Sequence, residues 1–323
     1  MKKIGVFTSG GDAPGMNACI RSVVRTANHH GVEVVGFIGG YEGLVHQNSR
    51  PLSPHDVANC IQKGGTILKS SRNQDFKTAE GRHRAYQNLR NLGVEGLVCI
   101  GGDGSYTGAH LFHKEYEIPV VGCPGTIDND LYGTDYTIGF DTAVNTVVDA
   151  LDKIRDTAES HNQVFFVEVM GRHSGFIALY SGMAGGAEMI MMPEVQGELS
   201  MLVEHFKLPQ KRKKEFSIIL VAEGDEEGCA FKAAETFKKE VPDIDPKVTV
   251  LGHVQRGGNP TASDRILASR LGSFATLSLL KGAQNSAAGI LNNQPVLTPL
   301  IEAASQSKKP HSDLFQLLNV LSL

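Results

Sequence analysis

Short apolar runs alternate with longer amphipathic stretches along the first part of the chain. Glycine or proline flanks the apolar runs, which predict buried strands at 4–8, 33–38, 96–100 and 119–122. The amphipathic stretches between them predict helices at 15–28, 80–92 and 105–116. Strands that alternate with helices predict a parallel sheet with helices on both faces.

The same alternation continues after a long predicted helix at 142–158. Further strands are predicted at 164–169, 189–192, 218–222 and 248–251. Further helices are predicted at 175–184, 232–240, 262–280 and 310–323. The fold class we expect is therefore α/β, with two lobes that each hold a largely parallel sheet flanked by helices, and with a boundary near residue 140.

Composition and charge exclude several classes of protein. Hydrophobic residues make up 41% and charged residues 20% of the 323 residues, which is ordinary globular composition and not that of a disordered or fibrous chain. The net charge is −4, so no broad basic surface is available and no nucleic-acid partner is expected. No apolar run reaches about 18 residues, so we expect no membrane span.

The N-terminus and the cysteines indicate a cytoplasmic location. The first residues, MKKIGVFTSGGD, carry no apolar core of a signal peptide and predict a strand. The five cysteines are odd in number, far apart and without a CxxC pair. They indicate neither a disulfide framework nor a zinc site, and small core residues in a reducing compartment are their simplest interpretation.

Glycine is the compositional outlier, with 36 of 323 residues against about 7% in average proteins. The first glycine motif, TSGGDAPGMN at 8–17, takes a strand into Gly10 and Gly11, and Pro14 lies near the start of the next helix. Backbone N–H groups at such a turn can cradle a phosphate. An ordinary tight turn is the alternative, because the motif matches neither GxGxxG nor GxxxxGK[ST].

The second glycine motif, IGGDGSYTG at 100–108, also follows a strand. Asp103 lies between Gly102 and Gly104, and Ser105 opens a helix. A carboxylate beside a phosphate-binding turn suits Mg²⁺, which binds few carboxylates together with substrate phosphates. A simple helix cap at Asp103 is the alternative.

An acidic turn follows in PGTIDNDLYGTDYTIGFDTA at 124–143. Asp128 and Asp130 lie two residues apart, and Asp135 is nearby. Open α/β sheets bind ligands at the carboxyl ends of their strands, where one carboxylate could accept a proton from a hydroxyl. The alternative is a solvated turn rich in aspartate and asparagine.

Two later motifs place cations beside glycines. In EVMGRHSG, at 168–175, Arg172 could reach a phosphate with its planar donor fork. In LGHVQRGGNPTASDR, at 251–265, His253 and Arg256 make a candidate anion pocket, with an ordinary loop as the alternative. Glycine turns, a carboxylate for Mg²⁺, a candidate base and arginines are together the parts that phosphoryl transfer needs.

These motifs, in this order, resemble the bacterial-type 6-phosphofructokinases over essentially the whole chain. The resemblance rests on GGDAPGMN, GGDGS, PGTIDND, EVMGR and LGHVQRGG. It implies ATP-dependent phosphorylation of the 1-hydroxyl of fructose 6-phosphate in glycolysis, with Mg²⁺, by a homotetramer. It also implies a larger ATP-binding lobe, 1–139 with 255–303, and a smaller sugar-phosphate lobe, 140–254 with 304–323.

The resemblance also implies roles for individual residues. Asp128 matches the base, with Thr126 beside it and Asp130 as the second acid, and Arg172 matches the arginine that steadies the moving phosphoryl group. Asp103 matches the magnesium ligand. The ATP-binding positions are Gly11, Arg72, Asn73, Gly102, Asp103, Gly104 and Ser105.

Sugar-phosphate and effector positions are implied in the same way. The sugar-phosphate positions are Thr126, Asp128, Met170, Gly171, Arg172, Glu223, His253 and Arg256, with Gln163 and Lys247 supplied by a neighbouring subunit. An effector, ADP or phosphoenolpyruvate, would bind at Arg21, Arg25, Arg155, Glu188, Arg212 and Lys214.

Several positions distinguish branches of the family or depart from its pattern. Pyrophosphate-dependent relatives carry Asp and Lys where this chain has Gly104 and Gly125, which favours ATP over pyrophosphate as donor. Gln163 and Lys247 stand where the family has arginines, Pro54 where an arginine is common, and Asn73 where an aromatic residue is frequent. The alternatives are a pyrophosphate-dependent enzyme, a kinase for another ketose 6-phosphate, and a non-catalytic paralogue that binds nucleotide and regulates a sister enzyme.

Overall fold

The computed structural model describes residues 1–71, 73–195, 197–207, 216–224, 229–306, 308–310 and 312–321. The chain divides into two compact units. The larger comprises Met1–Ile127, Leu131–Thr142 and Arg256–Lys308, and the smaller comprises Asp128–Asp130, Ala143–Gln255 and Lys309–Leu323. No helix among the described residues is long and apolar enough to span a bilayer.

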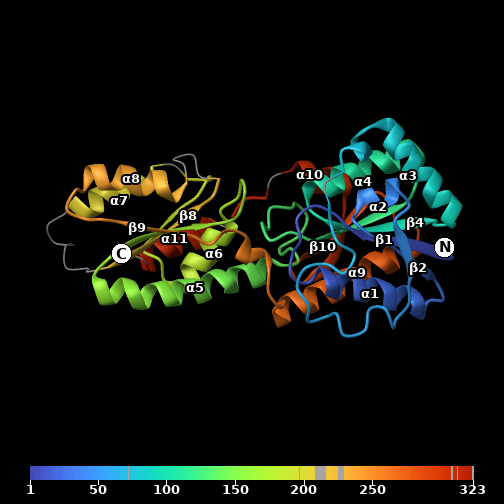
Figure 1. The fold of residues 1–323 in the computed structure, drawn as a ribbon, viewed down its shortest axis with the longest axis horizontal. Helices are drawn as coiled ribbons and strands as arrows, with labels where there is room; N and C mark the ends of the chain where they lie inside the picture. Colours follow the sequence, from blue (N-terminus) through green and yellow to red (C-terminus); the bar gives the residue numbers. More distant parts are fainter. Residues whose placement is uncertain are drawn as a thin grey trace. The chain divides into compact units, whose positions relative to one another are not determined.

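A seven-stranded sheet in the order β11-β10-β5-β4-β1-β2-β3 forms the middle of the larger unit (Figure 1). Its strands are β1 (Lys3–Thr8), β2 (Glu33–Phe37), β3 (Ser49–Leu52), β4 (Gly96–Gly101), β5 (Val120–Pro124), β10 (Ser286–Leu291) and β11 (Gln294–Pro299). The inner strands pair in parallel, and only the edge strands β3 and β11 pair antiparallel. The register pairs Thr8 with Ile100, so β1 and β4 end side by side.

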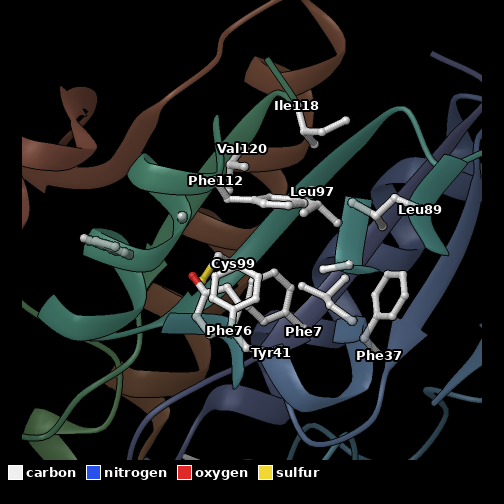
Figure 2. Close-up of a cluster of buried hydrophobic side chains, with 14 of the residues drawn as sticks. Phe7, Phe37, Tyr41, Phe76, Leu89, Leu97, Cys99, Phe112, Ile118 and Val120 are labelled. Carbon is white, nitrogen blue, oxygen red and sulfur yellow. The ribbon is translucent and has the colours of Figure 1, made fainter. Parts of the chain in front are cut away.

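Helices cover both faces of this sheet. On one face, α1 (Met16–His29) packs against α9 (Ala262–Leu280) (Figure 1). On the other lie α2 (Tyr41–Val45), η1 (Asp75–Lys77), α3 (Ala79–Leu92), α4 (Asp103–Tyr116) and α10 (Leu300–Ser305). Figure 2 shows the core beneath this second group, where Phe7, Tyr41, Phe76 and Phe112 meet.

The smaller unit holds a four-stranded, fully parallel sheet in the order β7-β8-β6-β9. Its strands are β6 (Val164–Val169), β7 (Met189–Met191), β8 (Ser217–Ala222) and β9 (Lys247–Val250). The helical segments are α5 (Phe140–His161), α6 (Phe176–Gly185), α7 (Glu198–Lys207), α8 (Ala230–Glu240), η2 (Gly252–Arg256) and α11 (Ser312–Leu321). Apolar residues of α7 and α8, including Leu202 and Phe237, pack on Phe166 and Ile219 of the sheet.

The predicted fold class is confirmed, since both units are α/β with largely parallel sheets flanked by helices. The structure adds elements that the hydrophobic pattern did not predict: α2, β3, η1, α7, η2, β10, β11 and α10. The hairpin of β10 and β11 turns at Asn292 and Asn293, which both have positive φ. Pro295 and Pro299 are compatible with β11 because this strand lies at the edge of the sheet.

Candidate functional site

The two glycine motifs lie side by side at the carboxyl edge of the larger sheet. β1 pairs with β4 on one side and with β2 on the other, so the strand order reverses at this point. The N–H of Ser9 donates to the carbonyl of Ile100, 2.9 Å away, and draws the two turns together. Ligands of open α/β sheets bind at such a switch point.

The N-terminus of α4 opens directly from the second glycine motif. Gly102, the residue before the helix, has no side chain that could cap it, whereas α3 begins with the Thr78 hydroxyl accepting from Gly81 N at 3.0 Å. The dipole of α4 favours an anion at this N-terminus, where first-turn N–H groups have no acceptor within the helix itself. A Cβ at Gly104 would meet no described protein atom within 4 Å, so this side of the turn is open space.

Two of the predicted residues outside the glycine motifs are brought close to them. A Cβ at Gly102 would lie 3.7 Å from Thr126 Cβ, an ordinary contact. A Cβ at Gly11 would lie 2.4 Å from Nη1 of Arg256, so the absence of a side chain at 11 makes room for that guanidinium. The structure therefore places Arg256, predicted as a sugar-phosphate residue, against the first glycine turn.

The segment before Arg72 is attached to the first turn. Asn17 donates to the carbonyls of Lys63 and Gly64, and Ser70 Oγ donates to the Gly10 carbonyl at 2.6 Å. Arg72 itself lies outside the described residues. The neighbouring residue Asn73, also predicted to bind ATP, uses its side chain locally, because its Oδ1 accepts from Phe76 N of η1 at 2.7 Å.

Tyr41 links this segment to α4, and the sequence analysis missed it. Its ring lies beside that of Phe76 (Figure 2), stacked with the ring centroids 4.0 Å apart, and its hydroxyl donates to the Ser105 carbonyl at 2.5 Å. Burial raises the pKa of the Tyr41 phenol well above its ordinary value, so the group stays a neutral donor. The tyrosine therefore joins the Asn73 segment to the predicted ATP-binding turn.

The acidic turn is a closed loop whose two ends are hydrogen-bonded. Ile138 N donates to the Pro124 carbonyl at 2.8 Å, and Thr137 Oγ1 donates to the Thr126 carbonyl at 2.7 Å. At the tip, Asn129 is fully buried with a positive φ of 54°, and its neighbours Asp128 and Asp130 remain partly exposed. Both residues thus keep part of their surface accessible to solvent.

In the smaller unit, Asp128 is joined to the turn that carries Arg172. Ser174 Oγ donates to the Asp128 carbonyl at 3.1 Å. Arg172 has a left-handed backbone, φ 58°, and its N–H donates to Glu223 Oε1 at 2.9 Å. Strained backbone of this kind is concentrated at functional sites. The structure therefore brings Asp128, Arg172 and Glu223 together, through a serine that the sequence analysis did not single out.

A buried glutamine connects Met170 to the segment with His253. Gln255 is fully buried, its Oε1 accepts from Met170 N at 3.2 Å, and its Nε2 donates to the Gly252 carbonyl at 3.0 Å. Gly171 has a positive φ, and a Cβ there would lie 2.2 Å from the Ser174 carbonyl. His253 is exposed on η2. No local pattern in the sequence signals the role of Gln255.

The positions predicted to act across subunits lie at the amino ends of two neighbouring strands of the smaller sheet, β6 and β9. The Gln163 backbone pairs with Ala158 and Ser217 at the start of β6. Lys247 Nζ lies 2.8 Å from Asp245 Oδ2, and both side chains are exposed.

The predicted effector residues fall in both units. In the smaller unit, Arg155 donates to the carbonyls of Gly185 and Gly186, and Glu188 accepts from Ile218 N at 2.5 Å. In the larger unit, Arg21 and Arg25 lie on α1. Arg212 and Lys214 lie outside the described residues.

Comparison with known proteins identifies the family. A family model described as phosphofructokinase matches residues 3–279. The chain belongs to the phosphofructokinase family. It is 55% identical over 323 residues to the ATP-dependent 6-phosphofructokinase 1 of Thermus thermophilus, with all of both chains covered. It is 50% identical over 323 residues to the ATP-dependent 6-phosphofructokinase of Bacillus subtilis, again with all of both chains covered.

Solved structures show the same fold. The phosphofructokinase of Saccharomyces cerevisiae superimposes with a TM-score of 0.88 at 37% identity, and 94% of this chain matches 45% of the yeast chain. This chain thus spans less than half the length of that yeast chain. A pyrophosphate-dependent phosphofructokinase of Marinobacter aquaeolei superimposes with a TM-score of 0.86 at 23% identity, covering 98% of this chain and 91% of that one, and shows the fold alone.

Proposed function

We propose that the chain is an ATP-dependent 6-phosphofructokinase of glycolysis. It would transfer the terminal phosphoryl group of ATP to the 1-hydroxyl of fructose 6-phosphate, giving fructose 1,6-bisphosphate and ADP. The observation that carries this proposal is the glycine-flanked N-terminus of α4, with Asp103 in its first turn and open space beside Gly104. The identity of about half of all positions to ATP-dependent 6-phosphofructokinases supports it.

Two glycines favour ATP over pyrophosphate for different steric reasons. The open side of Gly104 leaves space that a nucleotide's α-phosphate can occupy. At Gly125 there is no free space, because a Cβ would lie 2.9 Å from Ile100 Cγ2 and 3.0 Å from Met16 Cε. A lysine at 125, as in the pyrophosphate-dependent pattern, would not fit this backbone without movement of both side chains. Both positions therefore support the nucleotide as donor.

The larger unit would bind ATP, and most of the residues proposed for the sugar phosphate lie in the smaller unit. The proposed ATP-binding residues are Gly11, Arg72, Asn73, Gly102, Asp103, Gly104 and Ser105. Among the described residues, no three or more His, Cys, Asp or Glu side chains are grouped to hold a metal ion. A single carboxylate at Asp103, beside a turn open to phosphates, suits Mg²⁺ held partly by the substrate. When bound, Mg²⁺ would neutralise phosphate charge that develops during transfer.

Asp128 is the proposed base. Its carboxylate would accept the proton of the sugar 1-hydroxyl as that oxygen attacks the phosphorus atom. The guanidinium of Arg172 would offset negative charge on the transferring group. Ser174 joins the segments of these two residues at 3.1 Å, which supports their action on one reacting group. Thr126 and Asp130, on the same loop, would complete the catalytic set.

The sugar phosphate would be bound by Met170, Gly171, Glu223, His253 and Arg256 in addition to Thr126, Asp128 and Arg172. Gln163 and Lys247 of a neighbouring subunit in a homotetramer would face its 6-phosphate. A neutral amide at 163 and a single-pronged cation at 247 bind a phosphate less well than two arginines. We therefore propose weaker sugar-phosphate binding than in relatives with both arginines.

An effector site would bind ADP or phosphoenolpyruvate between subunits. Its proposed residues are Arg21, Arg25, Arg155, Glu188, Arg212 and Lys214. Arg155 already donates to two backbone carbonyls at the end of α6, which supports a fixed guanidinium at this place. Pro54 removes one cation that is common in the family, so the effector response would be weak.

A non-catalytic paralogue is the alternative of another class. It would bind ATP but lack turnover, whereas Asp103, Asp128 and Arg172 are all present here. Substitution of Asp128 by asparagine tests the proposal. An amide cannot accept the hydroxyl proton, and loss of a general base typically costs about 10²–10⁴-fold in rate. We expect kcat to fall by that factor while ATP affinity, measured by calorimetry, is retained. A kcat within about threefold of the parent value would contradict the assigned role.

A further inference from the structure

A buried carboxylate, Asp264, lies in the first turn of α9, outside the residues assigned to ATP or sugar phosphate. It is 1% exposed, and the Thr261 hydroxyl caps the helix by accepting from Asp264 N at 3.3 Å. An acid three residues after a capping threonine usually accepts from that threonine's backbone N–H. Here the hydroxyl of Thr142 lies between the two groups. It accepts from Thr261 N at 3.1 Å and donates to Asp264 Oδ2 at 2.5 Å.

The same carboxylate holds two further backbone groups. Asp264 Oδ1 accepts from Gly139 N at 2.8 Å, and Oδ2 accepts from Thr142 N at 2.8 Å. Asp141 Oδ2 accepts from Thr261 Oγ1 at 2.5 Å. Hydrogen bonds to an ionised acceptor are roughly twice as strong as neutral ones. The network therefore fixes residues 139–142 to the start of α9.

The segments joined by this network lead directly to proposed catalytic residues. Gly139 ends the loop that carries Asp128, and Thr142 is the last residue of the larger unit before the chain enters the smaller one. Arg256 is the first residue after the chain returns, five positions before Thr261. Position 139 favours glycine for two reasons. Its φ is positive, 104°, and a Cβ there would lie 2.7 Å from Ala13 Cβ in the first glycine turn.

We propose that Asp264, acting through Thr142, is a positioning residue that holds the Asp128 loop and the Arg256 segment in place for phosphoryl transfer. The inference rests on the proposed function, because it takes the roles of Asp128 and Arg256 from that reaction. Displacement of reacting groups by about 1 Å can cost about a hundredfold in rate. A loosened network should therefore lower catalysis in a protein that is still folded.

A matched pair of variants at Thr142 tests the proposal. Thr142→Val keeps the shape of the side chain but removes the hydroxyl, and Thr142→Ser keeps the hydroxyl. We expect Thr142→Val to lower kcat/KM for fructose 6-phosphate by about ten- to hundredfold, with KM for ATP changed by less than about threefold. Thr142→Ser should stay within about threefold of the parent enzyme in both constants.

Thr276→Val serves as the control for loss of a buried hydroxyl in the same unit. Thr276 is fully buried in α9, and its hydroxyl donates to the Gly272 carbonyl of the same helix at 2.8 Å. This variant should leave the kinetic constants unchanged. All assays are made well below the unfolding temperature of each variant, so that lowered stability alone does not reduce the measured rate.

Two results would overturn the inference. One is equal kinetics for Thr142→Val and Thr142→Ser in an active enzyme. The other, which needs no variant and no activity, is fast hydrogen exchange of the Gly139 and Thr142 amides in the parent protein, because both should be protected by the buried carboxylate. A parent protein without ATP-dependent turnover but with both amides protected would contradict the proposed function and leave the network itself confirmed.

Discussion

Substitution of Gly104 by aspartate should separate nucleotide from pyrophosphate as the phosphoryl donor. The position is exposed in the first turn of α4, and a side chain there would meet no described protein atom within 4 Å. An acid near a helix N-terminus stabilises the helix by about 0.3–1 kcal/mol, and the helix propensity of aspartate is no lower than that of glycine. The folded protein should therefore be at least as stable as the parent.

The expected loss concerns the nucleotide alone. A carboxylate at 104 would lie against the space assigned to the α-phosphate. At a separation of about 5 Å and an effective dielectric constant of about 20, two unit charges repel by about 3 kcal/mol. This corresponds to roughly a hundredfold loss of ATP affinity. Pyrophosphate has no counterpart of the α-phosphate, so its affinity should change little.

The assay is calorimetric titration of ATP and of pyrophosphate into the parent and two variants at 104. Gly104→Ala adds a Cβ without charge and separates steric overlap from repulsion. Leu111→Asp is the control, because Leu111 is 37% exposed and lies about 10 Å further along the same helix. Unchanged ATP affinity in Gly104→Asp, or equal losses for ATP and pyrophosphate, would refute the assignment of this turn to the nucleotide.

Two further predictions concern Arg256 and Asp264. The Cβ added by Gly11→Ala would lie 2.4 Å from Nη1 of Arg256, so it should displace that guanidinium and raise KM for fructose 6-phosphate about tenfold or more. In an Arg256→Ala background the same substitution should raise KM no further. Additive effects in the double variant would contradict this. Burial raises the pKa of the Asp264 carboxyl from 3.8 to about 6, so the folded protein holds this proton more tightly than the unfolded chain does. The resulting contribution to the free energy of unfolding is fully present below about pH 4 and is lost as the pH rises through 6. The quantity to measure is the free energy of unfolding in urea of the parent minus that of Asp264→Asn. This difference should increase by about 3 kcal/mol from pH 7 to pH 4, and a difference that does not depend on pH would contradict the prediction.

The strands and the glycine turns could be predicted because their signals are local. Most of the predicted strands are short apolar runs flanked by glycine or proline, and their alternation with helices indicates a parallel sheet. The hairpin at 286–299 was missed because two prolines interrupt its second strand. Asn292 and Asn293, which adopt the positive φ of the turn, were the available signal.

The contacts that support the site could be predicted only in part. The threonine and acid at 261 and 264 have the spacing of a capping box, so a helix start was readable there. Their link to Thr142 joins residues more than a hundred positions apart and has no local pattern. The same is true of Tyr41 with Ser105 and of Gln255 with Met170. Long-range hydrogen bonds of this kind require the packed structure.

The most direct test of the central claim is the donor requirement of the purified protein. Fructose 6-phosphate is supplied with Mg²⁺ and either ATP or pyrophosphate, and fructose 1,6-bisphosphate is measured. Space beside Gly104 suits a nucleotide, and crowding beside Gly125 excludes a lysine at that position. We therefore expect product with ATP, at a rate at least about a hundredfold above that with pyrophosphate. Product formed at a comparable or higher rate with pyrophosphate, or no product with either donor, would contradict the account.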